Sequence, residues 1–183
     1  MARGRPSKKG LIAEAAQKLF RVSGYQGTSI DQVVIEAGVS KPTVYSNYPS
    51  KLLLWQEVLQ RLIAQSQTEL EQQTQRLIEQ KVPFNEGWLQ LWRCWCDCPN
   101  RLSAYRIHWG EAHKLSATEK ALFSQLEQVL AEHLQTWLKH CQVDVQHYLV
   151  LFAVAQQTCL IAQLTPDSAC DVDLMPLLDQ LSQ

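Results

Sequence analysis

The chain has 183 residues, and its 17 lysines and arginines nearly balance its 18 acidic residues, which leaves a formal net charge of −1. With 46% apolar residues but only seven glycines and seven prolines, the composition indicates a mostly helical globular protein of one or two small domains. The longest apolar run, residues 149–155, is far too short to span a membrane, and the amino terminus lacks the apolar segment of a secretory signal. We therefore expect a cytoplasmic protein with no membrane partner.

The charge is unevenly distributed along the chain. Residues 1–51 contain eight lysines and arginines against three acidic residues, whereas the remaining residues contain nine against fifteen. A basic amino-terminal part suits the binding of phosphates, and an acidic remainder discourages nonspecific contacts elsewhere. Residues 1–9 would form either an arm that reaches phosphates or the minor groove, or a solvated tail.

The first 51 residues contain the pattern of three short helices. The first has an apolar stripe at helical spacing and ends at Gly24; the stripe consists of Ile12, Ala15, Ala16, Leu19 and Phe20. Thr28 is the expected N-cap of the second helix, with Asp31 completing a capping box, and Gly38 ends that helix. Ser40 is expected to cap the third helix, which Pro49 ends.

The third helix has two different faces. Val44 and Tyr48 are four residues apart and are expected to point into the core, whereas small polar and basic side chains lie on the other side. Two short helices joined by a glycine-centred turn are typical of a helix-turn-helix, whose second helix lies in the major groove of DNA.

These residues also resemble a known family. The two patterns are Ile12-x-x-Ala15-Ala16-x-x-Leu19-Phe20-x-x-x-Gly24-Tyr25-x-x-Thr28-Ser29 and Ala37-Gly38-Val39-Ser40-x-x-Thr43-x-Tyr45-x-x-Tyr48-x-x-Lys51-x-x-Leu54. Together they are similar to the amino-terminal domain of the TetR family of bacterial transcriptional regulators. The resemblance covers about the first 55 residues, and Tyr48 stands where the family usually has phenylalanine.

The resemblance implies an all-α fold of about nine helices, with a helix-turn-helix DNA-binding domain in residues 1–51 and a helical effector-binding and dimerisation domain in residues 52–183. It implies a homodimeric transcriptional regulator, a repressor that binds a palindromic double-stranded DNA operator and is released by a small-molecule effector of unknown identity. Thr28, Tyr45 and Lys51 would contact phosphates. Lys41, Pro42, Thr43, Ser46 and Asn47 would face base edges, and Ser40 and Tyr48 complete the predicted DNA-binding set.

The rest of the chain is a series of expected helices, over residues 53–80, 84–97, 102–114, 116–140, 145–164 and 172–181. The helix over 145–164 is apolar on most sides and must be buried, either within the monomer or against a second copy. The resemblance favours a dimer contact. The predicted contact residues are Tyr148, Leu149, Phe152, Ala155 and Cys159.

Aromatic residues gather in the middle of the chain. Trp88, Trp92 and Trp95 repeat at helical spacing, and further aromatic and histidine residues follow on the next helix. These side chains fit an aromatic-walled pocket for a flat or apolar effector, and they equally fit an ordinary core. The candidate pocket consists of Trp88, Trp92, Trp95, Tyr105, His108 and Trp109.

Cys94, Cys96 and Cys98 alternate with these tryptophans, without the two-residue gap of a zinc knuckle. Three interpretations stay open, namely small core residues, a thiol redox sensor or a metal sensor, and we predict no cofactor and no metal site. The sequence has no glycine-rich phosphate loop, nucleophile elbow or Glu-x-x-His pair, so we do not expect an enzyme. A helical thiol enzyme and an adaptor that does not bind DNA are the remaining alternatives.

Overall fold

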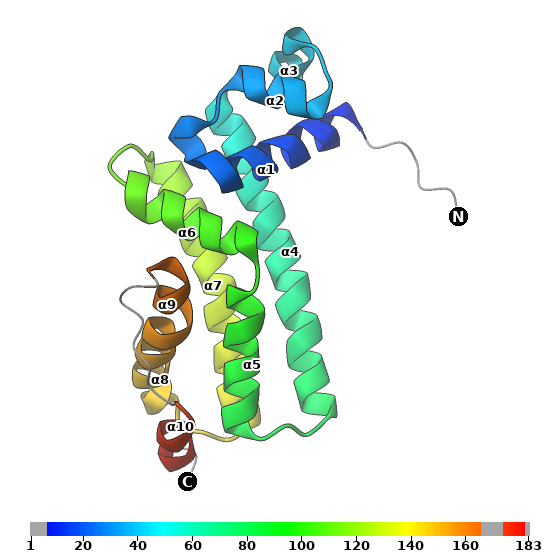
Figure 1. The fold of residues 1–183 in the computed structure, drawn as a ribbon. Helices are drawn as coiled ribbons and strands as arrows, with labels where there is room; N and C mark the ends of the chain where they lie inside the picture. Colours follow the sequence, from blue (N-terminus) through cyan, green and yellow to red (C-terminus); the bar gives the residue numbers. More distant parts are fainter. Residues whose placement is uncertain (1–6, 166–173, 182–183) are drawn as a thin grey trace, which may run out of the picture. The chain divides into compact units, whose positions relative to one another are not determined.

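The computed structural model of the chain describes residues 7–165 and 174–181 (Figure 1). These residues are largely helical and contain no strand, so the prediction of an all-α fold is confirmed. The chain forms two compact units, each built from separate parts of the sequence. The first contains the residues up to Leu62 together with Ser103–Phe123, and the second contains Ile63–Leu102 together with the residues from Ser124 onward. The predicted domain boundary after residue 51 stays a prediction.

The first unit contains α1 (Lys8–Gly27), α2 (Ile30–Ala37), α3 (Lys41–Asn47) and the beginning of α4 (Lys51–Glu79). It also takes most of α6 (Pro99–Glu111) and the start of α7 (Ala117–His140). The apolar stripe of α1 and the inward side chains of α2 and α3 form one core, in which Ile12, Val33 and Val44 have no exposed surface. The ring of Phe20 meets Trp55 of α4 edge to face at 5.1 Å. This core fixes the positions of the two short helices.

The predicted cap of α2 was wrong by one residue. The N-cap of α2 is Ser29 rather than Thr28, and Gln32 rather than Asp31 completes the capping box. The Ser29 amide donates to Gln32 Oε1 at 2.7 Å, and the Gln32 amide donates to Ser29 Oγ at 3.2 Å. Gly24 interrupts α1 with φ 70° and ψ 176°, after which a last turn runs to Gly27. The glycine is needed there because side chains rarely tolerate a positive φ.

The second unit contains the rest of α4 and α7 together with α5 (Phe84–Cys96), α8 (Tyr148–Ala155), α9 (Ala162–Leu164) and α10 (Met175–Leu181). Its core is rich in tryptophan. Trp137 of α7 packs directly on the backbone of α5, where Gly87 leaves room for the indole. The Trp137 Nε1 group donates to the carbonyl of Phe84 at 2.9 Å, which satisfies its hydrogen bond.

The predicted helix over 145–164 is present but is not uniform. It begins with a 3₁₀ turn, η1 (Val145–His147), continues as α8, and passes through a π-helical segment, η2 (Gln156–Ile161), into α9. Helix α6 begins at Pro99, earlier than the predicted residue 102, because a proline fits the first turn of a helix, where no amide donor is needed. The predicted last helix, 172–181, is seen as α10, and residues 172–173 lie outside the described residues.

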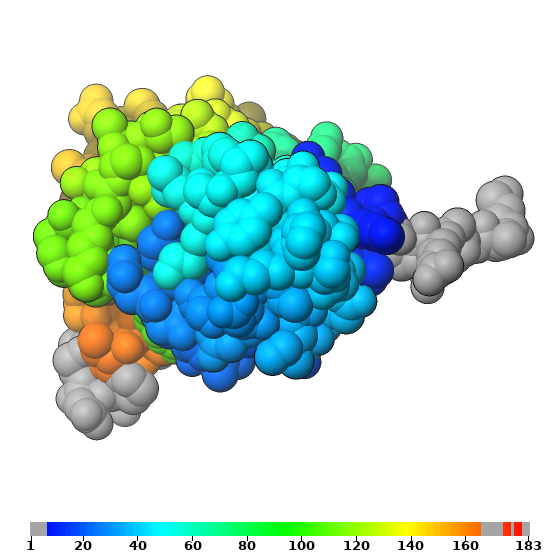
Figure 2. Space-filling model, turned by 90° about the horizontal axis from the view of Figure 1, so that it is seen from above, coloured from blue at the N-terminus to red at the C-terminus, as the bar shows by residue number. Residues whose placement is uncertain are grey.

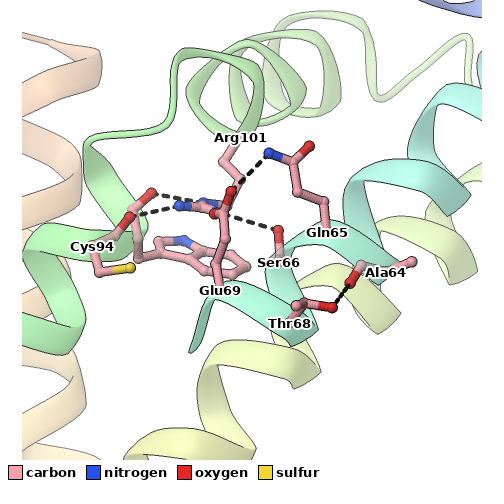
Figure 3. A network of polar contacts seen from close by, with 8 residues as sticks. Ala64, Gln65, Ser66, Thr68, Glu69, Cys94 and Arg101 are labelled. Atoms are coloured by element: carbon pink, nitrogen blue, oxygen red, sulfur yellow. Dashed lines mark hydrogen bonds and ion pairs between the residues drawn. The ribbon is translucent and has the colours of Figure 1, made fainter. Parts of the chain in front are cut away.

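A buried arginine joins three helices of the second unit (Figure 3). Arg101 of α6 donates from Nε to the carbonyl of Trp95 at 2.8 Å and from Nη2 to the carbonyl of Cys94 at 2.6 Å. Its Nη1 group donates to Ser66 Oγ at 3.1 Å and Glu69 Oε2 at 2.7 Å, both on α4. The guanidinium therefore caps the last carbonyls of α5, where the helix dipole favours a positive charge. Burial has the largest single effect on Glu69 and raises its pKa, but the hydrogen bonds from Arg101 and Gln65 together with the charge of Arg101 bring the pKa below its usual value.

Candidate nucleic-acid interface

The turn between α2 and α3 has the geometry of a helix-turn-helix. Gly38 ends α2 in the left-handed conformation, with φ 62° and ψ 36°, and its amide donates back to the carbonyls of Ile35 and Val34. The next amide, of Val39, also donates to Val34, at 3.3 Å. Ser40 then caps α3, as predicted, by accepting from the amide of Thr43 at 3.3 Å. Glycine is required at residue 38 because of its positive φ and not because of crowding.

Helix α3 is anchored on one side and exposed on the other. Val44 has no exposed surface and Tyr48 has only 3%, so both point into the core as predicted. On the opposite side Lys41, Tyr45 and Ser46 are exposed, and Tyr45 presents 44% of its surface. Figure 2 shows the face of the molecule on which α2 and α3, in light blue, lie together.

Several of the predicted base-contacting side chains are held by bonds within α3 and its cap. Thr43 Oγ1 lies 2.8 Å from Ser40 Oγ. The hydroxyl of Ser46 and the amide nitrogen of Asn47 both donate to the carbonyl of Thr43, at 3.0 and 2.8 Å. These bonds limit the rotamers of the side chains on this surface. Asn47 would have to give up its bond to its own helix to pair with an adenine edge.

Lys41, the basic residue of α3, is paired within the motif. Its ammonium lies 2.7 Å from Asp31 Oδ1 of α2, and both side chains are exposed. The hydrogen bond and charge of Asp31 raise the pKa of Lys41 above its usual value, so the ammonium keeps its proton. An exposed pair of this kind contributes little stability and is easily exchanged for a phosphate or a base edge.

The predicted phosphate contacts fall into two groups. Tyr45 is exposed, whereas Thr28 is 1% exposed and donates its hydroxyl to the carbonyl of Gly24 at 2.8 Å. The Lys51 ammonium donates to the carbonyls of Tyr25 at 2.9 Å and Thr28 at 3.0 Å, and it lies 4.5 Å from the centre of the Tyr25 ring. Thr28 and Lys51 therefore hold the connection between α1 and α2 together, and their predicted phosphate contacts stay predictions.

No sequence pattern indicates the role of Lys9. Its carbonyl accepts from the hydroxyl of Tyr48 at 3.3 Å, and its ammonium lies 3.3 Å from Glu57 Oε2. This hydrogen bond connects Tyr48 to α1 over a separation of 39 residues in the sequence. Patterns of residues three or four apart cannot predict such a contact. The predicted arm over residues 1–9 falls partly outside the described residues, and Lys8 and Lys9 already belong to α1.

The six predicted effector-pocket residues are divided between the two units. Trp88, Trp92 and Trp95 belong to the second unit and have no exposed surface. Tyr105, His108 and Trp109 belong to the first, where His108 stacks on Phe123 at 3.8 Å. Burial and Lys120 lower the pKa of His108, which keeps the ring neutral.

Of the cysteines that the structure describes, Cys96 is buried and Cys94 and Cys159 are partly buried. Burial raises the pKa of Cys94 and Cys159 and raises that of Cys96 to about 12. The thiolate is the reactive form, so these raised values disfavour a redox sensor at these three thiols. Among the described residues, no group of three or more histidine, cysteine or acidic side chains is placed to hold a metal ion.

The predicted dimer residues lie on α8 and η2 and differ in exposure. Ala155 is buried, Tyr148, Phe152 and Cys159 are half-buried, and Leu149 is 74% exposed. Val145 and Val150 of the same segment are also more than half exposed. Val145–Leu164 is the one segment of the described chain whose length and composition would allow it to cross a membrane, with a mean hydropathy of 1.3.

Comparisons with known proteins agree with this geometry. Residues 12–58 match the family described as bacterial regulatory proteins, tetR family. Over 80 residues the chain is 35% identical to YhgD of Bacillus subtilis, an uncharacterised HTH-type transcriptional regulator, covering 44% of this chain and 40% of that protein. Over 57 residues it is 40% identical to the HTH-type transcriptional activator FasR of Mycolicibacterium smegmatis, covering 31% of this chain and 26% of that protein. The matches thus span less than half the length of these relatives.

Solved structures resemble the whole chain. A protein of Mesorhizobium loti assigned to the TetR family has a TM-score of 0.68 at 22% identity, covering 96% of this chain and 91% of its own. A TetR-family regulator from Streptomyces coelicolor has a TM-score of 0.62 at 21% identity, covering 98% of this chain and 79% of its own. At these identities the likeness concerns the fold. Residues 12–58 thus match the amino-terminal part of the tetR family of bacterial regulatory proteins, and the fold of the whole chain is that of solved TetR-family regulators.

Proposed function

We propose that this protein is a transcriptional regulator that binds a palindromic DNA operator as a homodimer and leaves it when a small-molecule effector binds. The observation that carries the proposal is α3, which is fixed to the core by Val44 and Tyr48 and presents Lys41, Tyr45 and Ser46 to solvent. A short helix held in this way can enter a major groove with its base-reading side chains outward.

The proposed DNA contacts follow from this exposure. Lys41, Pro42, Thr43, Ser46 and Asn47 read base edges, whereas Tyr45 contacts a phosphate and sets the register. The net positive charge of residues 1–51 supports the same orientation, because it draws this end of the chain to the duplex.

The apolar surface of α8 supports dimerisation. One helix covers only a few base pairs, whereas two copies related by a dyad cover two half-sites. Leu149 and Val150 are exposed side by side, and an exposed apolar surface is stabilised by a partner. A membrane is the other partner that this surface could have, but three consecutive polar residues, Gln156, Gln157 and Thr158, lie near the middle of the segment and oppose insertion.

The proposal is tested by selecting a preferred site from a random duplex library with the full-length protein and measuring affinity by fluorescence anisotropy. We expect a palindromic site, and we expect Thr43→Ala and Tyr45→Ala each to weaken binding about tenfold or more, because a lost contact costs about 1–3 kcal/mol. Lys139→Gln, which removes an exposed charge at the end of α7, is the control. Unchanged affinity in both α3 variants would exclude this face as the DNA-binding surface.

A further inference from the structure

Two buried hydrogen-bond donors on α5 lack an acceptor among the described residues. The Nε1 groups of Trp88 and Trp92 are fully buried and unpaired. Other indoles of the same core are engaged, since Trp137 donates to Phe84 and Trp95 stacks on the guanidinium of Arg101 at 4.9 Å. Buried donors are nearly always paired because an unpaired donor has lost its bonds to water. Two such donors, one helical turn apart, point to an acceptor supplied by a bound molecule.

Both indoles belong to one group of aromatic rings between α5 and α8. Trp88 lies 6.5 Å from Tyr148 in an edge-to-face arrangement, and Trp92 lies 5.2 Å from Phe152. Tyr148 and Phe152 are themselves 5.6 Å apart. We call these four residues the aromatic cluster. Their rings favour a flat apolar molecule, and the two indole N–H groups favour one that carries a hydrogen-bond acceptor.

The helix that faces α5 has a second unusual feature. Directly after α8 the chain forms the π-helical segment η2, which packs against α5. Such segments are rare and occur frequently at functional sites. This backbone feature is independent of the unpaired indoles and lies on the same pair of helices.

A surface groove is lined by residues of α5 and by one residue of α10. Its volume is about 360 Å³, and it is lined by Glu86, Leu89, Gln90, Arg93 and Met175. Leu89 and Arg93 directly follow Trp88 and Trp92 in the sequence, so the groove and the two indoles share the same turns of α5. The exposed guanidinium of Arg93 favours an acidic group in a molecule that enters from this side.

We propose that the aromatic cluster is the effector site, and that its ligand is a flat apolar molecule with an acidic hydrogen-bond-accepting group that pairs with the indole N–H groups of Trp88 and Trp92. This inference rests on the proposed effector response and narrows the predicted pocket to residues of the second unit. Tyr105, His108 and Trp109 are not part of the site.

The test uses two probes that differ only in the acceptor. The first, 1-anilinonaphthalene-8-sulfonate, carries a sulfonate, and the second, N-phenyl-1-naphthylamine, has the same rings without it. Affinities are measured by isothermal titration of the full-length protein. We expect the sulfonate probe to bind at one site per protomer and about tenfold more tightly, the ratio that one hydrogen bond to a charged group provides.

Variants then assign the preference to the two indoles. In a Trp88→Phe/Trp92→Phe protein, which keeps rings in the cluster but lacks the N–H groups, we expect most of the preference for the sulfonate probe to be lost. Retained binding of the neutral probe shows that the site is still folded. Trp109→Phe, which alters a half-exposed indole in the first unit, is the matched control and should keep the tenfold preference.

The indole N–H resonances of the wild-type protein provide a second readout that does not depend on the variants folding. Of the six tryptophan signals, we expect those of Trp88 and Trp92 to shift downfield with the sulfonate probe and not with the neutral one. Equal affinity of the two probes for the wild-type protein, or six signals that respond alike to both, would overturn the inference. DNA binding is measured separately on the selected duplex, so a protein that binds DNA but shows no probe preference refutes this inference and leaves the proposed DNA binding intact.

Discussion

Lys51 stabilises the entry to the helix-turn-helix by bonding to backbone atoms far from it in sequence. Its ammonium donates to the carbonyls of Tyr25 and Thr28, which lie between the Gly24 break and the cap of α2. Because α2 begins directly after this connection, the position of Lys51 fixes where the motif starts. The resemblance to the family assigns Lys51 a phosphate contact, whereas these bonds assign it a structural role.

Replacing Lys51 with methionine should therefore reduce stability and leave the salt dependence of DNA binding unchanged. We expect a loss of about 1.5–3 kcal/mol in urea unfolding, the usual contribution of hydrogen bonds to a charged group. Lys18→Met is the control, since its exposed pair with Glu36 should contribute less than about 1 kcal/mol. A slope of log K against log salt that falls by about one in Lys51→Met would instead identify a phosphate contact.

Gly87 is a second residue whose role depends on one close contact. A Cβ atom at this position would lie 2.2 Å from the Trp137 ring, a distance at which the indole must move. We expect Gly87→Ala to destabilise the protein by about 1–3 kcal/mol or more, as overpacking of a core does. Gly110→Ala is the matched control, because Gly110 is helical and has open space around it. Thermal unfolding of both proteins measures the loss of stability. Equal unfolding temperatures would contradict the close packing of Trp137 on Gly87.

At the scale of elements, His133 joins α7 to α4. Its Nδ1 lies 3.1 Å from Thr74 Oγ1 and its Nε2 lies 3.4 Å from Gln67 Nε2. Burial lowers the pKa of His133, while Glu71 and Glu132 act in the opposite direction. The folded protein therefore favours the neutral imidazole of His133 between α4 and α7.

The lowered pKa of His133 predicts a loss of stability in mild acid. The folded state binds the proton less tightly than the unfolded chain, so stability is present above the ordinary histidine pKa of about 6.5 and is lost as the pH falls below it. His108 contributes in the same direction. Urea unfolding at about pH 7.5 and about pH 5.5 gives the difference in the free energy of unfolding between the two pH values. This difference should be smaller in His133→Gln than in the wild-type protein. The exposed His113→Gln is the control, and an unchanged pH dependence in His133→Gln would contradict this role.

Helices and caps could largely be predicted from the sequence, because they depend on residues three or four apart. The capping box of α7, formed by Ser116 and Glu119, depends on residues only three apart. The cap of α2 was misplaced because Thr28 with Asp31 and Ser29 with Gln32 offer the same spacing one residue apart. Local patterns cannot show which distant helices pack together, and the predicted effector pocket, which stays a prediction, takes its residues from both units.

At the scale of the whole molecule, the exposed apolar surface of α8 is expected to hold two copies together. Leu149→Gln combined with Val150→Gln should weaken the dimer at least tenfold, because both side chains are more than half exposed and would bury their surface only at the interface. Sedimentation velocity measures the dissociation. Val22→Gln, at an exposed apolar position of α1, is the control. Sedimentation of the double variant as an unchanged dimer would exclude this surface as the interface.

We propose that two copies of α3 read two half-sites in the major groove. Methylation interference on the selected duplex tests this claim, since dimethyl sulfate modifies guanine N7 in the major groove and adenine N3 in the minor groove. We predict that guanine methylation blocks binding at two positions related by a dyad, with half-sites one helical turn or a multiple of it apart. Interference only from adenine methylation, or from one half-site alone, would contradict the claim.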